Sequence, residues 1–213
     1  IDIFKRLKGI LQSINMLALV GWGEPFMSPY FNEMISIAKK FGVGVNFTTN
    51  GMNLCDEDFL GKIYIDRNIF SINISFDGAT EPTFNSIRRG ARYHNVIDNI
   101  IKINELKRRY VLRNPALYFS FVAMKKNINE LCPLIDLSAK LGISGINVTF
   151  LTVHGESLRN ESLFYHKDLA NKVFAEAKEK AQEKGVQVYL PEYFKKENTI
   201  NTVSGQPYKS NAF

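Results

Sequence analysis

Apolar positions along the chain follow two rhythms that alternate with each other. Alternating apolar and polar residues predict strands near residues 17–20, 43–47, 70–76, 117–121, 146–150 and 186–190. Apolar residues three or four apart predict helices near 2–13, 31–41, 56–62, 96–106, 128–141 and 166–184. Gly42, Gly142 and Gly185 follow three of these helices and predict their ends. The order predicts βαβ units with parallel strands, the first of them a buried strand at Met16–Val20.

The polar residues within this alternation distinguish a barrel from an open, doubly wound sheet. A doubly wound sheet has helices on both faces, so its strands are apolar on both. Here the second face is small and polar, at Asn46, Thr48, Asn50, Ser71, Asn73, Ser75, Asp77, Ser120, Asn147 and Thr149. A buried polar group without a partner costs about 1–3 kcal/mol, so this face must meet water or a ligand. The pattern predicts an α/β fold, a partial (β/α)6 TIM-like barrel with parallel strands and a large ligand inside.

Composition supports one sizeable folded domain and excludes several classes of partner. The 213 residues are 45% hydrophobic and 23% charged, and no apolar run approaches the roughly 20 residues of a membrane helix. The net charge of +6 is scattered apart from Lys107-Arg108-Arg109 and Lys195-Lys196, so we expect solvated helix faces and no nucleic-acid partner. Two distant cysteines, Cys55 and Cys132, make neither a disulfide framework nor a metal knuckle, which favours a cytoplasmic protein.

Three motifs stand where a predicted strand ends and a helix follows, at residues 21–25, 48–51 and 75–78. Polar and glycine-rich strand ends are how a β/α barrel builds a ligand site. Gly21 and Gly23 leave room for strand-end carbonyls to approach a ligand ammonium. The Ser75 hydroxyl and the Asp77 carboxylate suit the two hydroxyls of a ribose.

Structural interpretations of the same motifs stay open. Glu24 alternatively caps the helix that follows it, and Asp77 alternatively forms a tight turn with the glycine after it. Thr48 and Asn50 alternatively satisfy backbone groups at the end of their strand.

The ordered set of motifs resembles the radical S-adenosylmethionine (radical SAM) enzymes. Gly21-Trp22-Gly23-Glu24-Pro25 is similar to their Gly-x-Gly-Glu-Pro motif, and Thr49-Asn50-Gly51 to the end of their third strand. Residues 74–78 with 87–90 resemble their fourth unit, and 141–151 their fifth helix and sixth strand. The resemblance covers residues 1–153 and implies a core that lacks its first strand and cluster loop. Residues 154–213 are then a C-terminal extension, resembling the linker to a second cluster domain of the SPASM type.

The resemblance also implies a set of cofactor-binding residues. Gly23 and Glu24 are expected at the methionyl amino group and Arg88 at the methionyl carboxylate, with Arg89 as the rival. The remaining expected contacts are at the ribose or beside it (Ser75, Asp77, Thr48, Asn50) and on the adenine side (Ser120, Asn147, Leu151). No catalytic residue and no metal ligand is assigned within this chain.

One departure from the family pattern concerns its [4Fe-4S] cluster. The family holds that cluster with a Cys-x3-Cys-x2-Cys motif, which this sequence lacks. Three thiolates are needed to leave one iron free for the cofactor. We therefore expect the cysteines upstream of this chain, which alone would be inactive.

The resemblance implies an iron–sulfur oxidoreductase chemistry for the intact protein. S-adenosylmethionine would be cleaved reductively to a 5′-deoxyadenosyl radical, which abstracts hydrogen from a substrate that we hypothesise to be a peptide or protein. A flavodoxin or ferredoxin is the expected electron donor. Two alternatives remain: a non-catalytic nucleotide- or partner-binding module on a degenerate barrel, and a phosphate-binding barrel lyase or aldolase. The last needs a strand-end lysine or metal-ligand cluster, which the predicted strands lack.

Overall fold

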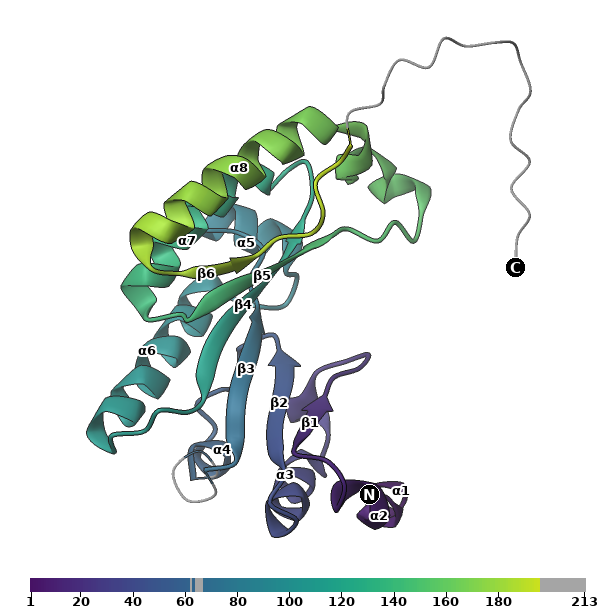
Figure 1. Ribbon diagram of the computed structural model, residues 1–213, viewed down its shortest axis with the longest axis vertical. Coiled ribbons are helices and arrows are strands. Elements are labelled where there is room, and N and C mark those ends of the chain that lie inside the picture. Colours follow the sequence, from purple (N-terminus) through teal and green to yellow (C-terminus); the bar gives the residue numbers. More distant parts are fainter. Residues whose placement is uncertain (62, 64–66, 196–213) are drawn as a thin grey trace, which may run out of the picture.

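A single parallel sheet forms the centre of the computed structural model, which describes residues 1–61, 63 and 67–195 (Figure 1). Within these residues the sheet has six strands, in the spatial order β1-β2-β3-β4-β5-β6. The strands are β1 (Met16–Leu19), β2 (Gly44–Thr49), β3 (Ile69–Ser75), β4 (Ala116–Ala123), β5 (Gly145–Phe150) and β6 (Gln187–Tyr189). Every neighbouring pair is parallel.

Sequential strand order identifies the type of α/β fold. In a doubly wound sheet the order reverses at a switch point, whereas here each strand lies beside the next one in sequence. Such an order is that of a β/α barrel opened along one side. The predicted partial TIM-like barrel is therefore confirmed.

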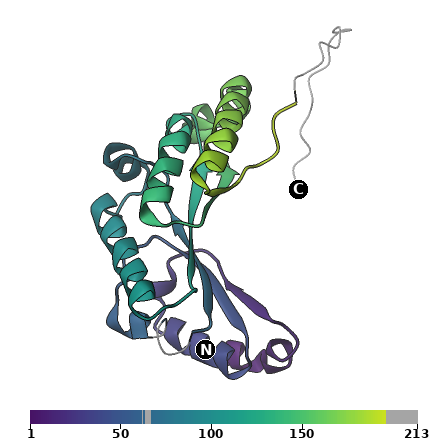
Figure 2. The ribbon, with the colours of Figure 1, turned by 60° about the vertical axis from the view of Figure 1, so that its left-hand side comes forward.

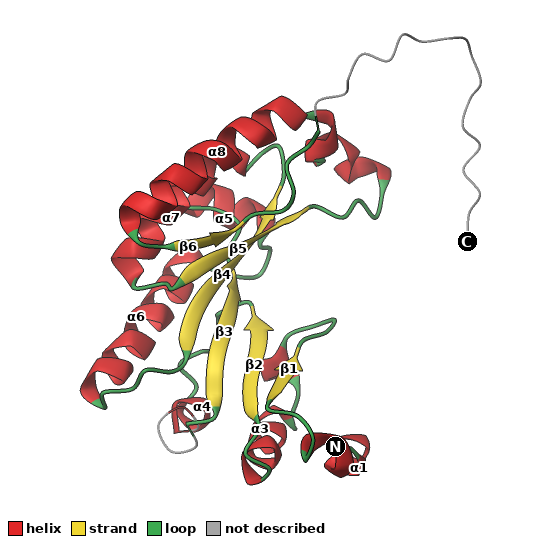
Figure 3. Cartoon of the chain, in the orientation of Figure 1, coloured by secondary structure: helices red, strands yellow, loops and turns green. Residues whose placement is uncertain are grey.

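Helices connect the strands and pack against one side of the sheet. In Figures 1 and 2, α6, α7 and α8 run along the same side. The helices, red in Figure 3, are α1 (Asp2–Arg6), α2 (Lys8–Leu11), α3 (Phe31–Lys40), α4 (Glu57–Gly61), α5 (Glu81–Ile87), α6 (Tyr93–Arg109), α7 (Leu131–Leu141) and α8 (Lys167–Lys184). Short 3-10 turns are η1 (Pro25–Met27), η3 (Ile128–Glu130), η4 (Glu156–Glu161) and η5 (Leu163–Tyr165).

The predicted helices are present with two differences, and one predicted helix end is not tested. The helix expected at 2–13 is divided at Leu7, whose ψ of 9° leaves the α-helical range. Helix α5 was not predicted as a separate helix. The end of the helix expected at 56–62 lies outside the described residues. The predicted helix ends are confirmed at Gly142 and Gly185, which adopt φ values of +67° and +66°, a left-handed conformation that glycine reaches without strain.

The apolar side chains of the strands lie beneath the helices. Phe47, Ile72, Ile74, Phe119 and Ile146 are all fully buried. Burying each such side chain contributes roughly 1.5–3 kcal/mol relative to exposure. This hydrophobic face holds the sheet to its helical layer.

The opposite face of the sheet carries the polar side chains and is half-buried. In register, Ser75 lies beside Ser120 and Ser120 beside Asn147. The Asn147 side chain donates to Asn73 Oδ1 at 2.8 Å, although strand β4 lies between their two strands. Neighbouring strands are about 4.8 Å apart, so these amides meet because the sheet is concave on its polar side.

Three apolar residues are exposed against expectation. Strand β1 was expected to be buried, but Met16 and Val20 are exposed because β1 pairs within the described chain only with β2. Phe70 was expected beneath the helices. A register irregularity beside Asn46 turns it outward, and its ring lies where a side chain on Gly44 would have to be.

The chain after residue 153 continues the sheet. Strand β6 pairs with β5, and α8 contacts α7. The expected extension at 154–213 therefore contributes to this domain as far as Tyr189, while residues 196–213 lie outside the described chain. The boundary after residue 153 stays a prediction. Within the described residues, no helix has both the length and the apolar character needed to cross a membrane.

Glu130, at the end of η3, fixes the start of α5. Its carboxylate accepts the backbone N–H groups of Ala79 and Thr80 at 2.6 and 3.0 Å. It also accepts the hydroxyls of Thr80, at 2.8 Å, and Thr83. Partial burial acts to raise the pKa of Glu130, but these hydrogen bonds outweigh it and the pKa is lowered.

Replacing Glu130 with Gln should destabilise the fold by about 1 kcal/mol at neutral pH, because the amide presents N–H groups to N–H and hydroxyl donors. The pKa in the folded state lies below the unfolded value of about 4.3. The wild-type advantage is therefore present above that pH and is lost as pH falls through the folded-state pKa. Urea unfolding at several pH values measures this. The control is E105Q on the exposed surface of α6. A stability difference between wild type and E130Q that stays the same in acid would contradict the role given to the ionised Glu130 carboxylate.

Candidate functional site

The carboxyl ends of the strands meet at one edge of the concave face. Parallel strands place these ends together, which is where β/α folds bind ligands. The three strand-end motifs of the sequence follow β1, β2 and β3 and therefore lie on neighbouring strands of this edge.

Glu24 ties the loop after β1 to the end of β2. One carboxylate oxygen accepts the Thr49 hydroxyl at 2.5 Å and the other accepts the Asn50 backbone N–H at 2.7 Å. Gly23 precedes it with a φ of +113°, which side chains rarely allow. Both carboxylate oxygens of Glu24 are thus engaged within the protein.

The end of β2 is held further by its own side chains. Thr49 Oγ1 accepts the Gly51 N–H at 3.1 Å, and Asn50 Oδ1 accepts the Met52 N–H at 2.8 Å. Asn99 on α6 donates to the Gly51 carbonyl at 3.0 Å. The Asn50 side chain therefore satisfies a backbone N–H group at the end of its strand, which was the structural alternative to a ligand contact. Thr49 was missed, because its side chain lies on the buried side of the strand.

Asp77 does not stand free in the lumen as expected. Its side chain is 2% exposed, with Oδ2 lying 2.5 Å from Arg88 Nε and Oδ1 accepting the Val122 N–H at 2.6 Å. Burial raises the pKa of Asp77 even against the nearby guanidinium and the Val122 hydrogen bond. Asp77 and Arg88 therefore form a close ion pair that is largely shielded from water on the Asp77 side.

Asn127, in the loop after β4, binds the backbone on both sides of the Asp77 contact. It is fully buried, and its amide donates to the carbonyls of Asp77 and Val122 at 3.0 and 2.9 Å. Its Oδ1 accepts the Met124 N–H at 2.8 Å. No periodic pattern marks this residue in the sequence, because it follows the strand in an irregular loop.

Several polar groups on the concave face have no partner within the described chain. They include the Ser75 and Ser120 hydroxyls, which are register neighbours on β3 and β4, and the Thr48 hydroxyl, which faces Asn73 across the strand pair. All are half-buried and open to a ligand. Of the expected site residues, Ser75, Ser120 and Asn147 form one row across the sheet, and Leu151 follows the end of β5.

Trp22 and His154 approach each other from loops at opposite sides of the sheet. Their ring centroids are 6.4 Å apart, although Trp22 follows β1 and His154 follows β5. The Trp22 ring is 99% exposed, so the two rings approach without packing. The approach is a second sign that the concave face curls upon itself.

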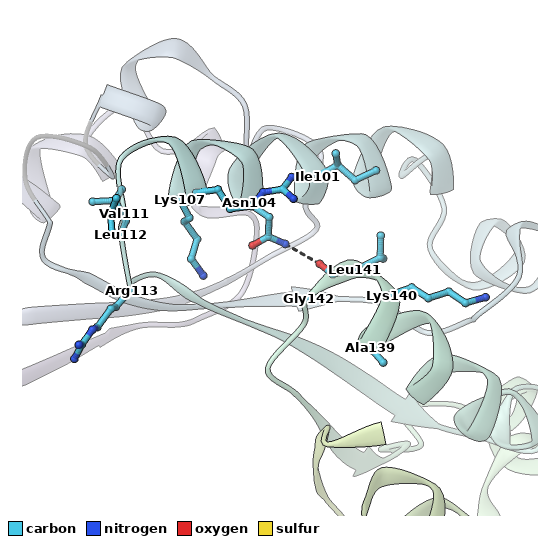
Figure 4. Close-up of a pocket in the computed structure, with 11 residues that line it drawn as sticks. Ile101, Asn104, Lys107, Val111, Leu112, Arg113, Ala139, Lys140, Leu141 and Gly142 are labelled. Carbon is cyan, nitrogen blue, oxygen red and sulfur yellow. Dashed lines mark hydrogen bonds between the residues drawn. The ribbon is translucent and has the colours of Figure 1, made fainter. Parts of the chain in front are cut away.

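A cavity of about 840 Å³ lies elsewhere, between the carboxyl ends of α6 and α7. Lys107, Arg113 and Lys140 are among its lining residues, and in Figure 4 their side chains point in different directions. The cavity lies near the amino ends of β4 and β5, away from the polar edge. Because the cavity lies away from the polar edge and its basic side chains do not converge on one point, we do not assign it to the candidate site.

Comparison with known proteins gives relatives but no match to a family model. The tungsten-containing aldehyde ferredoxin oxidoreductase cofactor-modifying protein of Pyrococcus furiosus is 26% identical over 140 residues, covering 65% of this chain and 38% of that protein. The mycofactocin maturase MftC of Mycobacterium tuberculosis is 26% identical over 158 residues, covering 71% and 37%. A probable GTP 3′,8-cyclase of Sulfurisphaera tokodaii is 26% identical over 209 residues, covering 96% and 62%.

Solved structures share the fold at lower identity. Streptococcus suis SuiB bound to S-adenosylmethionine has a TM-score of 0.67 at 13% identity, covering 87% of this chain and 41% of that one. SuiB bound to its precursor peptide SuiA gives 0.64 at 12% identity, covering 88% and 41%. Native anSMEcpe with bound AdoMet and a Kp18Cys peptide gives 0.62 at 15% identity, covering 87% and 54%. These similarities in sequence and fold support the resemblance of the chain to the radical SAM superfamily. It spans only 38% and 37% of the length of the first two relatives.

Within the described part of the chain, no three His, Cys, Asp or Glu side chains gather as metal ligands. Cys55 and Cys132 are half-buried. Burial raises the pKa of both thiols, which disfavours the thiolate form that ligates a cluster.

Replacing Glu24 with Ala should destabilise the protein by about 1–2 kcal/mol, because the Asn50 N–H and the Thr49 hydroxyl lose their partner. Replacing Glu24 with Gln should cost little, since the amide oxygen can accept from Asn50 while its NH2 donates to Thr49. Urea unfolding of the two variants measures the difference. Equal stability of E24A and E24Q would contradict the tie between the β1 loop and β2.

Proposed function

We propose that this chain is the core of a radical SAM enzyme that binds S-adenosylmethionine on the concave face. The observation that carries the proposal is the pair of unpartnered hydroxyls on the concave face, Ser75 at the end of β3 and Ser120 in register with it on β4. Relatives of the chain have enzyme names, and two proteins of the same fold were solved with this cofactor.

The available groups fit the chemistry of this cofactor. Free hydroxyls at Ser75 and Ser120 match a ribose or adenine. Arg88 is 29% exposed and contacts Asp77 only through Nε, so its two terminal nitrogens can hold the methionyl carboxylate. Carbonyls of the exposed loop that contains Gly23 would accept the methionyl ammonium.

The other expected cofactor residues support the site in different ways. Because the carboxylates of Glu24 and Asp77 are already engaged, Glu24 would set the loop, and Asp77 would orient Arg88 in addition to any contact with the ribose. Asn50 would hold its turn. Thr48 and Leu151 would line the pocket, with Leu151 on the adenine side as the family resemblance implies. Asn147, for which the resemblance also implies the adenine side, would lie at the edge of the pocket, because its amide is paired with Asn73.

When bound and reductively cleaved, S-adenosylmethionine would supply a 5′-deoxyadenosyl radical that abstracts hydrogen from the substrate. The described residues do not provide the three thiolates of a [4Fe-4S] cluster, so we assign no step of this chemistry to a cluster ligand of this chain. The chain's own contribution is to bind and orient the cofactor and to exclude water from the concave face.

We further propose that the substrate is a peptide or protein. MftC is named a maturase, and SuiB and anSMEcpe were solved with bound peptides. A flavodoxin or ferredoxin as electron donor, and a SPASM-type domain after residues 154–213, complete the proposal for the intact protein.

Replacing Arg88 with Gln should weaken S-adenosylmethionine binding about tenfold or more, because a charge-assisted contact to the carboxylate is lost. The adjacent Arg89 is exposed, so R89Q is the matched control and should bind as wild type does. Equilibrium dialysis with the anaerobically reconstituted protein measures both. Equal affinity of R88Q and R89Q would contradict the role of Arg88.

The enzyme proposal itself is tested by product. The intact protein, prepared anaerobically with iron and sulfide, should release 5′-deoxyadenosine from S-adenosylmethionine after reduction with dithionite, as measured by chromatography. Binding of the cofactor without any release would instead favour a non-catalytic module on this fold.

A further inference from the structure

Asn73 and Asn147 form an amide pair in the middle of the concave face. Asn73 is on β3 and Asn147 on β5, and their side chains meet above β4. The Asn147 NH2 group donates to Asn73 Oδ1 at 2.8 Å. Each residue thereby fixes the orientation of the other.

The pair leaves one donor and one acceptor without a partner in the described chain. The NH2 group of Asn73 and the Oδ1 atom of Asn147 make none of the hydrogen bonds found there. A fixed donor beside a fixed acceptor is complementary to a peptide group, which offers a carbonyl and an N–H. Both residues are half-buried, so a ligand that reaches them sheds part of its water.

Aromatic surface flanks the pair on the same face. Tyr118 is the register neighbour of Asn73, and its ring lies over Gly145, where an added Cβ would come within 3.2 Å of it. Tyr189 is the register neighbour of Asn147 and is 52% exposed. An amide pair with one tyrosine on β4 and another on β6 can hold a peptide group together with an apolar side chain.

Only Asn73 lies deeper than the row assigned to the cofactor, because Asn147 is in register with Ser120, which is in register with Ser75. Asn73 precedes Ser75 by one inward-facing position of β3. Asn147 lies three residues before the end of β5. A molecule held by both amides would therefore reach from the row of Ser75 and Ser120 to the position below it and would lie next to the cofactor.

We propose that Asn73 and Asn147 bind a backbone amide group of the peptide substrate and thereby determine which residue lies next to the cofactor. The inference rests on the proposed function, since it takes the upper edge of the face as the cofactor's place. Adenine also offers a donor beside an acceptor, so the experiment must separate the two ligands.

The experiment uses Asn73→Asp, which keeps the oxygen that accepts from Asn147 but removes the free donor. The control is Asn46→Asp, which makes the same change of charge on the same face of β2, away from the pair. The probe is N-acetylphenylalanine methylamide, and its methyl ester lacks the terminal N–H. Saturation-transfer NMR reports binding of each probe to the anaerobically reconstituted protein, and equilibrium dialysis reports S-adenosylmethionine.

The proposal expects the methylamide to bind wild type and N46D, and to bind N73D roughly tenfold more weakly. The ester should bind wild type more weakly than the methylamide, and S-adenosylmethionine affinity should be the same in all three proteins. Equal methylamide binding by N73D and N46D would overturn the proposal. A loss of S-adenosylmethionine affinity confined to N73D would also overturn it, by assigning the pair to adenine. Failure of wild type to bind S-adenosylmethionine while the methylamide still binds would count against the proposed function instead.

Discussion

The structure depends on a sheet whose two faces have opposite solvation. Phe47, Ile72 and Phe119 bind the helical layer through burial, whereas the polar residues between them cannot be covered by an apolar helix without losing hydrogen bonds. The sheet curls toward its polar side, as the contact between Asn73 and Asn147 shows. Concavity and polarity therefore coincide, and the chain gains a wall suited to a polar ligand.

The polar side chains around the site fall into two sets, those that are hydrogen-bonded within the protein and those that are open to a ligand. Glu24, Asp77 and Glu130 are each held by the protein itself, and each connects a loop to a neighbouring strand end or helix start. Ser75 and Ser120 are left open on the wall. The engaged groups hold the strand-end loops in position, so the open groups can meet a ligand without a large ordering cost.

Much of the fold could be predicted from the sequence, because strand alternation and glycine helix ends are local signals. The pairing of Asn73 with Asn147 could not be predicted, since it depends on curvature across β4. The burial of Asp77 could not be predicted either, since it depends on Arg88 and Val122 from other parts of the chain. Phe70 was misplaced because a register irregularity reverses its facing and leaves no mark in the alternation. The strand-end positions of Glu24 and Ser75 were predictable. It was not predictable that the Glu24 carboxylate is hydrogen-bonded within the protein while the Ser75 hydroxyl is open to a ligand, because this depends on partners from other strands.

The central claim is that the concave polar wall, and not the cavity between α6 and α7, receives S-adenosylmethionine. A crystal structure of the intact, anaerobically reconstituted protein with this cofactor tests it most directly. The account predicts ligand density at the carboxyl ends of β2 to β5, with a ligand oxygen or nitrogen within hydrogen-bonding distance of Ser75 or Ser120. Cofactor density beside Lys107 and Arg113, with the wall occupied only by water, would contradict it.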